Sequence, residues 1–221
     1  MSRLIRIWDL PTRIFHWTLV ACVIGLVVSA EFDFMDWHFR LGYTVLALLL
    51  FRLVWGVAGG HWSRFSSFLY SPATVRRYLR GQGETAHSAG HSPTGALSVY
   101  ALLLFLGAQV ASGLFSDDEI AASGPLTAWV SGGFVSKATW YHGKVGKLIL
   151  IVLVALHVAA VVYYLWRKGE NLVRPMITGD KELPESVPPS RDDIRTRLVA
   201  AAALAAAVGL VLLLLRFAPG A

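Results

Sequence analysis

The stretch YHGKVGKLILIVLVALHV, residues 141–158, decides the fold. Together with the residues up to 166 it forms an apolar run long enough to cross a lipid bilayer, and it carries His142 and His157. His157 follows His142 by 15 positions, which on a regular α-helix is about 22 Å of rise and a net rotation of roughly 60°. We therefore expect both imidazoles on a similar face of one transmembrane helix, near opposite sides of the bilayer.

Apolar blocks of similar length recur along the chain. Of its 221 residues, 55% are hydrophobic and only 15% are charged, whereas a soluble domain carries about a quarter charged residues. Five blocks are predicted to span a membrane, at residues 14–30, 39–58, 95–115, 145–166 and 198–217. The sequence thus predicts an all-α membrane protein, with a four-helix transmembrane bundle and a fifth C-terminal transmembrane helix.

Lysine and arginine gather on one side of these predicted spans. They lie before the first block, between the second and third, and between the fourth and fifth, whereas the opposite side is rich in Asp and Glu. The positive-inside rule then predicts a multi-pass membrane protein with a cytoplasmic N-terminus. Because the basic residues flank apolar blocks and form no single stripe, membrane lipid is the expected surrounding and nucleic acid is excluded.

The chain has one cysteine, Cys22, which lies inside the first apolar block. A lone thiol excludes an internal disulfide, a Cys-x-x-Cys-His attachment of c-type haem and an iron–sulfur cluster held by four thiolates. The first block follows Arg13 and is succeeded by further spans, so we expect a retained helix and no cleaved signal peptide.

Four histidines lie in or at the ends of the predicted spans: His16, His38, His142 and His157. Ionisable residues at membrane depth are costly and are candidates for function. Depth pairs His16 with His157 near the cytoplasm and His38 with His142 near the outer side. Two imidazoles at each of two depths are what two stacked haems require, because neutral imidazole is a common axial haem ligand. The alternative is that these are ordinary hydrogen-bonded histidines at the membrane interface.

Three further residues are candidates for contact with such cofactors. Arg52 follows His38 by 14 positions, about 21 Å and roughly −40° on a helix, so it shares the face of His38 at the depth of the inner pair. A haem propionate would pair with this arginine, unless its side chain reaches back to the cytoplasmic surface. At the outer end, Arg40 could pair with a propionate of the outer haem in the same way or lie at the membrane interface. His91 precedes a Ser-Pro helix start and is a cap residue, a propionate contact or a proton carrier for a quinone.

Several segments resemble the bacterial cytochrome b561 family, which includes the cytochrome b subunits of membrane-bound nickel–iron hydrogenases. They are WDLPTRIFHW at 8–17, RLVWG at 52–56, GHSPTGAL at 90–97, LHVAAV at 156–161 and ENLVRPMITGDK at 170–181. The resemblance implies a four-helix domain over residues 1–181 that binds two b haems. Residues 182–197 would then be a cytoplasmic linker and 198–221 an added transmembrane helix.

The family's ligand pattern falls on His16, His38, His142 and His157, in agreement with the depth argument. In the family the two histidines of the fourth helix are usually one position closer together than here, and the shortest members have no fifth span. The resemblance implies electron transfer between a periplasmic partner, such as a c-type cytochrome or a hydrogenase, and the quinone pool. A quinone site is expected on the cytoplasmic side, near His16, Arg52 and His91.

Other functions compete with an electron-transfer cytochrome. The chain could be a self-contained oxidoreductase that oxidises superoxide and reduces quinone, or a membrane anchor subunit of a larger redox complex. A metal-ion transporter is disfavoured because no acidic residue lies in any predicted span. We assign no catalytic residue, expect an electron-transfer subunit more than an independent enzyme, and leave a homodimer open.

Overall fold

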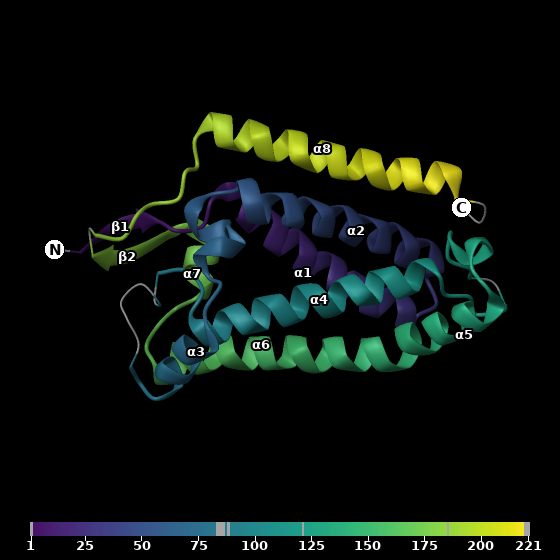
Figure 1. Cartoon of the computed structure of the whole chain (residues 1–221), viewed down its shortest axis with the longest axis horizontal. Helices are drawn as coiled ribbons and strands as arrows, with labels where there is room; N and C mark the ends of the chain where they lie inside the picture. The colour runs from purple at the N-terminus through teal and green to yellow at the C-terminus, as the bar shows by residue number, and fades with distance from the viewer. Residues whose placement is uncertain (1, 83–86, 88, 121, 185, 219–221) are drawn as a thin grey trace. The chain divides into compact units, whose positions relative to one another are not determined.

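A computed structural model describes residues 2–82, 87, 89–120, 122–184 and 186–218, so part of the expected C-terminal segment 198–221 lies outside it. Within these residues, five helical segments are long and apolar enough to cross a membrane (Figure 1). They are α1 (Leu10–Glu31), α2 (Met35–Ala58), α4 (Pro93–Leu114), the continuous segment Gly132–Arg167 and α8 (Ile194–Phe217). The expected helical membrane fold is confirmed.

The segment Gly132–Arg167 consists of three consecutive helices. It begins as α5 (Gly132–Trp140), continues as the π-helix η5 (Tyr141–Gly146) and ends as α6 (Lys147–Arg167). The helix therefore starts well before residue 145, where the apolar run alone places its beginning. The remaining elements are short, namely the strands β1 (Ser2–Arg6) and β2 (Asp180–Pro184), the helices α3 (Pro72–Leu79) and α7 (Val173–Thr178), and the 3-10 turns η1 (His61–Ser63), η2 (Phe65–Ser67) and η4 (Thr127–Trp129).

The chain forms two compact units, and all five long segments contribute residues to both. Unit 1 comprises Met1–His16, Arg52–Ala101 and Leu156–Ala203. Unit 2 comprises Trp17–Phe51, Leu102–Ala155 and Leu204–Ala221. Each unit contains one of the two histidine pairs that the sequence predicts, so the two are described separately.

In unit 1, β1 pairs with β2 in an antiparallel ribbon with Ser2 opposite Pro184 and Arg6 opposite Asp180 (Figure 1). This ribbon was not predicted. Alternation along the first strand buries Ile5 and Ile7 and turns Arg6 away from them. The buried side chains form a small core of Ile5, Ile7, Trp8, Trp62, Ala89, Leu183 and Val187. The ribbon thus joins the beginning of the chain to residues 180–184.

The start of α1 is fixed by Asp9, which is fully buried. Its Oδ1 accepts a hydrogen bond from the N–H of Thr12 at 2.8 Å, the usual bond of a helix N-cap. Its Oδ2 accepts hydrogen bonds from the N–H of Gly60 at 3.1 Å and from Ser63 Oγ at 2.8 Å, and Trp55 Nε1 lies 3.2 Å from Oδ1. A buried carboxylate with these donors is satisfied, so this residue of the 8–17 motif has a structural role.

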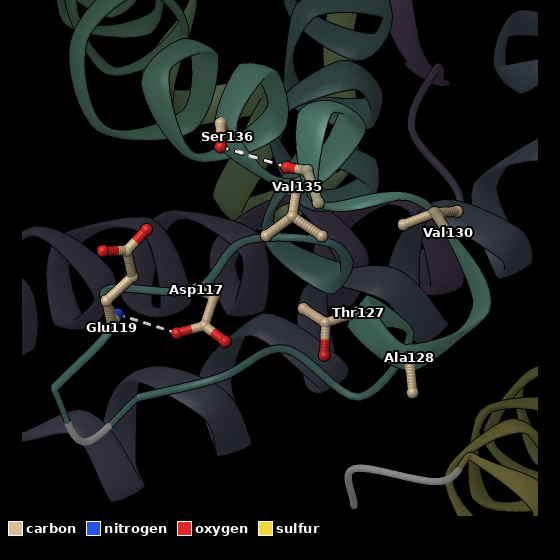
Figure 2. Close-up of a pocket in the computed structure, with 8 residues that line it drawn as sticks. Asp117, Glu119, Thr127, Ala128, Val130, Val135 and Ser136 are labelled. Atoms are coloured by element: carbon tan, nitrogen blue, oxygen red, sulfur yellow. Dashed lines mark hydrogen bonds between the residues drawn. The ribbon is translucent and has the colours of Figure 1, made fainter.

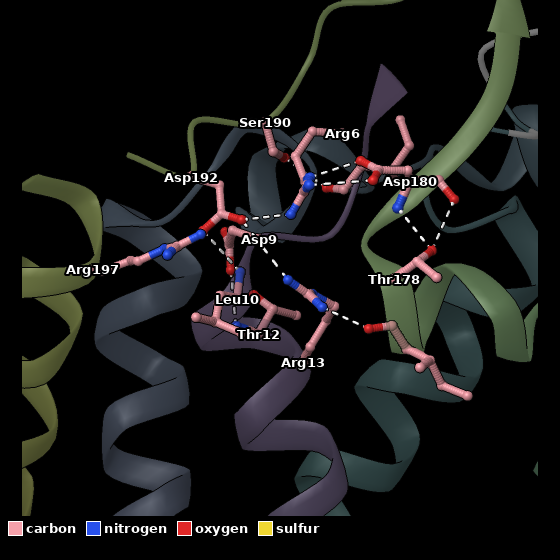
Figure 3. A network of polar contacts seen from close by, with 12 residues as sticks. Arg6, Asp9, Leu10, Thr12, Arg13, Thr178, Asp180, Ser190, Asp192 and Arg197 are labelled. Carbon is pink, nitrogen blue, oxygen red and sulfur yellow. Dashed lines mark hydrogen bonds and ion pairs between the residues drawn. The ribbon is translucent and has the colours of Figure 1, made fainter. Parts of the chain in front are cut away.

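A polar network ties the expected linker 182–197 to the rest of unit 1 (Figure 3). Arg6 donates to Asp180 Oδ1 and to Asp192 Oδ2, both at 2.7 Å. Asp192 Oδ1 also accepts from the Leu10 N–H and from Arg197 Nε, both at 3.1 Å. Burial disfavours the ionised carboxylate of Asp192, but these hydrogen bonds outweigh burial and hold its pKa below the ordinary value. The segment is therefore packed against unit 1.

In unit 2, the segment between α4 and α5 folds back onto the end of α4. Leu126 N–H donates to the Leu114 carbonyl at 2.9 Å, and Asp117 N–H donates to Thr139 Oγ1 at 3.0 Å. Since Thr139 lies one helical turn before His142, these bonds hold the segment next to the start of the π-helix. The helix pair α1 and α2 is joined by a short turn in which Asp33 has a φ of 60°.

Candidate functional site

The rings of His38 and His142 lie next to each other in unit 2. Their centroids lie 6.1 Å apart and their planes are nearly perpendicular, at 85°. An imidazole–metal–imidazole arrangement needs two metal–nitrogen bonds of about 2 Å in line, which with the ring radii separates the centroids by about 6 Å. The pair therefore has the spacing of two axial ligands to one metal ion.

Hydrogen bonds determine which nitrogen of each ring is available. Nδ1 of His38 lies 3.2 Å from the Leu26 carbonyl oxygen, and Nδ1 of His142 lies 2.9 Å from the Gln109 carbonyl oxygen. A carbonyl oxygen only accepts, so each Nδ1 carries the proton and each Nε2 keeps its lone pair. Histidines that bind metals commonly donate their other ring N–H to a main-chain carbonyl in this way.

The site lacks the donors that a simple metal ion would need. Among the described residues, no group of three or more His, Cys, Asp or Glu side chains is placed to hold a metal ion. A haem needs only two axial ligands from the protein, because the porphyrin supplies the other four. Two neighbouring histidines with free Nε2 atoms therefore fit haem iron better than a bare ion.

The segment from His142 to His157 begins in a π-helix. The expectation of roughly 60° assumed a regular α-helix between them, but Tyr141–Gly146 is π-helical, so that estimate is wrong. A π-turn accommodates one residue more than an α-turn and is often found at functional sites. We therefore expect this turn to hold the one position by which the spacing exceeds that of the family it resembles. Gly113 on α4 lies beside it, where a Cβ atom would come within 2.8 Å of the His142 ring.

Unit 1 brings together the other candidate residues. His16 lies on α1 and His157 on α6, and the two imidazoles interact electrostatically. His91 is buried, with its ring centroid 4.8 Å from Trp8 and 4.4 Å from Phe68. Burial, followed by the charges of Arg52, His157 and His16, lowers the pKa of His91 to about 3. The residues that the sequence predicts near the cytoplasmic side thus lie together in one unit.

The low pKa of His91 argues against one of the three alternatives that the sequence leaves open for it. A proton carrier for a quinone would titrate near neutral pH, whereas this imidazole stays neutral well below that range. Its Nδ1 is buried and has no hydrogen-bond partner among the described residues. A buried polar atom without a partner is costly, so this nitrogen is suited to a hydrogen bond with a bound group.

Arg52 is buried, with 4% of its surface exposed, so its side chain does not reach back to the surface. Its guanidinium carbon lies 4.6 Å above the ring of Phe65, and its Nη1 is buried with no hydrogen-bond partner among the described residues. This geometry leaves a guanidinium N–H for an anionic group such as a propionate. Arg40, by contrast, is exposed, and its guanidinium lies 5.6 Å from the ring centroid of Trp37.

A separate surface depression lies in the segment between α4 and α5 and at the start of α5. It is an open depression of about 450 Å³ lined by Asp117, Glu119, Thr127, Ala128, Val130, Gly132, Val135 and Ser136 (Figure 2). Its lining contains no histidine. Within it the Glu119 N–H donates to Asp117 Oδ1 at 2.7 Å, so part of its acidic surface is used in local turn structure.

One residue of the site was not found from the sequence. Gln109, on α4, contacts His142 through both its main chain and its side chain. The available signal was a polar amide inside an otherwise apolar block at 95–115, which is uncommon in a membrane span.

Comparisons with known proteins agree with this chemistry. A family model described as prokaryotic cytochrome b561 matches residues 7–179. A probable Ni/Fe-hydrogenase B-type cytochrome subunit of Bradyrhizobium diazoefficiens is 23% identical over 214 residues, covering 80% of this chain and 85% of that protein. A protein of the same name from Cupriavidus necator is 23% identical over 210 residues, covering 78% and 85%. No solved structure matches. The chain is a multi-pass membrane protein and belongs to the prokaryotic cytochrome b561 family of b-type, haem-binding electron-transfer cytochromes.

Proposed function

We propose that the chain is a dihaem cytochrome b that transfers electrons across the bacterial inner membrane between a periplasmic redox partner and the quinone pool. The observation that carries this proposal is the neighbouring pair of His38 and His142, 6.1 Å apart, with both Nδ1 atoms engaged by carbonyl oxygens. Bound haem would supply a one-electron couple between ferric and ferrous iron. The protein's part is to hold two such groups, one in each unit.

In unit 2, His38 and His142 would be the axial ligands. Their Nδ1–H groups donate to Leu26 and Gln109, which fixes the tautomer and makes Nε2 a stronger donor to iron. In unit 1, His16 and His157 would be the ligands of the second haem. The buried Nη1 of Arg52 would donate to a propionate, and the neutral His91 would donate or accept one hydrogen bond through Nδ1.

The positive-inside rule supports the orientation. Arginines of the N-terminal segment, of the segment between α2 and α4, and of residues 167–197 all belong to unit 1, so we propose that unit 1 faces the cytoplasm. The turn between α1 and α2, with Glu31 at the end of α1, Asp33 in the turn and Asp36 at the start of α2, would then face the periplasm. We retain residues 1–181 as the part that contacts both haems, with the segment 182–193 packed against unit 1 and α8 as an added span.

The periplasmic partner that the comparisons favour is a hydrogenase, because both relatives carry that name. A c-type cytochrome is the alternative partner. We propose that quinone reacts near unit 1, where His16, Arg52 and His91 lie together. Since the pKa of His91 is lowered to about 3, its role there would be hydrogen bonding, and the protons for quinone would come from other groups or water.

The haem content of the purified protein tests the proposal. A pyridine haemochrome assay is expected to give b haem at about two per chain, with low-spin spectra typical of bis-histidine ligation. A ratio near one would remove the dihaem model. The partner is tested separately, by asking whether hydrogen or a reduced c-type cytochrome reduces the haems in membranes that contain the native complex. If neither does so, the proposed periplasmic partners are wrong even when both haems are present.

A further inference from the structure

We propose that Gln109 is a positioning residue for the unit 2 haem site, whose side-chain amide holds the π-turn Tyr141–Gly146 so that His142 points towards His38. The inference rests on the proposed function, because it requires that His38 and His142 bind a haem. It goes further by assigning a role to a residue that neither touches the haem iron nor belongs to the ligand set.

Gln109 and His142 are joined by two hydrogen bonds that run in opposite directions. His142 donates from Nδ1 to the main-chain carbonyl of Gln109 at 2.9 Å. Gln109 donates from Nε2 to the main-chain carbonyl of His142, also at 2.9 Å. The first bond orients the imidazole ring, and the second attaches the backbone of the same residue to α4. Together they fix both the position and the direction of the ligand.

The amide at position 109 is not explained by packing. Its Oε1 is buried and has no hydrogen-bond partner among the described residues, and a buried acceptor without a partner is destabilising. A residue selected only to fill this space in an apolar helix would be apolar. The Nε2 bond to the His142 carbonyl is therefore the contribution that accounts for an amide here.

The π-turn is shaped to admit this side chain. A Cβ atom built on Gly146 would lie 2.0 Å from Gln109 Oε1 and 2.9 Å from Tyr141 Cε1, so only glycine leaves room for the amide. Gly143, in the same turn, has no atom within 4 Å of a built Cβ. The close approach is thus specific to the glycine that faces Gln109, and Gly143 provides a matched control.

The expected effect of losing the amide follows from this geometry. The main-chain acceptor at position 109 survives substitution, but the π-turn is no longer attached to α4. The His142 ring can then turn away from its carbonyl acceptor, and the imidazole becomes a weaker donor to iron. A weaker donor stabilises ferric iron less, so the reduction potential of this haem rises and its retention falls.

The experiment compares Gln109→Met, Gly146→Ala and the double variant with two controls. Gln82→Met removes an exposed glutamine, and Gly143→Ala adds a methyl group in the open part of the same turn. Reduction potentials come from spectroelectrochemical titration, ligand geometry from the low-spin ferric EPR signals, and retention from haem loss to a scavenger protein. The unit 2 component is identified as the one that is absent in His38→Ala.

Gln109→Met is expected to raise the potential of the unit 2 component, shift its EPR signal and weaken its haem retention by about 10–100-fold, with the other component unchanged. Gly146→Ala should do the same by displacing the amide. The double variant should show no more than the larger single effect, because both changes break one interaction. Both controls should resemble the wild type.

Three outcomes would overturn the inference. The first is a wild-type unit 2 component in both single variants. The second is an equal effect of Gly143→Ala and Gly146→Ala, which would indicate a general effect of helix propensity. The third is an unchanged unit 2 component in Gly146→Ala when Gln109→Met has lost both haems and cannot be interpreted. Failure of the proposed function looks different, since the wild type would then lack any component that depends on His38.

Discussion

His38 and His142 lie with their rings nearly perpendicular and their centroids 6.1 Å apart, and each directs Nδ1 at a main-chain carbonyl oxygen rather than at the other ring. The acceptors belong to two different helices, α1 for His38 and α4 for His142. The two Nε2 atoms are therefore presented with their lone pairs free. Such preorganisation lowers the conformational cost of binding a cofactor.

The first prediction concerns which histidines share a haem. His38→Ala and His142→Ala are each expected to remove the same redox component, because one missing axial ligand leaves the iron of that haem without its bis-histidine coordination. His16→Ala and His157→Ala should remove the other component. Potentiometric titration of the four variants in membranes checks this. Loss of one common component in His16→Ala and His38→Ala would contradict the pairing.

The second prediction concerns the buried guanidinium of Arg52. Replacement by Met should lower the potential of the unit 1 component, because a nearby positive charge favours the ferrous state, which carries one positive charge less. A hydrogen bond to a charged group is worth about 1.5–3 kcal/mol, so haem binding in this unit should weaken by a comparable amount.

Arg40→Met is the matched control for Arg52→Met, because Arg40 is exposed and contacts Trp37. It should leave both potentials close to those of the wild type. Redox titration and haem retention provide the two measurements. A larger change in Arg40→Met than in Arg52→Met would show that the unit 2 haem, and not the unit 1 haem, depends on an arginine.

The third prediction is a dependence of stability on pH through His91. Burial and the charges of Arg52, His157 and His16 lower the pKa of His91 to about 3, whereas the unfolded imidazole has a pKa of about 6.5. Between these values the unfolded chain binds a proton that the folded chain does not, so stability falls as the pH is lowered from about 6.5 towards 3.

His91→Gln should therefore lose stability less steeply with acidification than the wild type. Thermal unfolding in detergent is monitored by haem absorption at several values from pH 4.5 to 8. It gives the change of stability with pH for each of the two proteins. At pH 8 the imidazole is neutral in both the folded and the unfolded chain. The difference in stability between the two proteins at this pH therefore measures the cost of the substitution itself. Parallel slopes over the acid range would show that His91 is accessible to protons in the folded protein.

The fourth prediction concerns truncation. A cut after Lys181 divides β2 and removes Ser190, whose N–H donates to the Arg6 carbonyl and whose Oγ donates to the Ile7 carbonyl, both at 2.7 Å. It also removes Asp192 from its contacts with Arg6 and Leu10. We expect this protein to lose thermal stability and haem from unit 1.

A cut after Asp193 removes α8 but keeps those contacts, so both haems should be retained and assembly with a partner should weaken. Haem content and thermal stability of the two truncated proteins make the comparison. Equal stability would show that the segment 182–193 contributes little, and haem loss in the longer protein would show that α8 closes a haem site.

The helical membrane fold and the grouping of the histidines follow from patterns that act over long distances in the sequence. Apolar blocks of membrane length predict spans whatever their neighbours are, and His38 and His142 do meet in unit 2. The ribbon of β1 and β2 was missed because two five-residue strands separated by most of the chain have no local signal. The start of the fourth span was placed too late because helix continues through the less apolar α5.

The features that were missed at the site depend on packing between helices. A π-turn at Tyr141–Gly146 and a hydrogen bond from the Gln109 amide to the His142 carbonyl have no marker in hydropathy, and a single glutamine does not reveal its partner. The burial that keeps His91 neutral was also not foreseeable from its place before a helix start, because Trp8 and Phe68 cover it from distant parts of the chain.

The π-turn also bears on how relatives of this chain should be aligned. An alignment program that compares this chain with family members whose two fourth-helix histidines are one position closer must open a one-residue gap. We expect that gap between His142 and Gly146, because a π-turn holds one residue more than an α-turn. A gap opened before His142 or after His157 would match one of these histidines to a different residue, and a proposed haem ligand would then be missed. Surveys of the family should therefore place the gap after His142, in the remaining part of the π-turn.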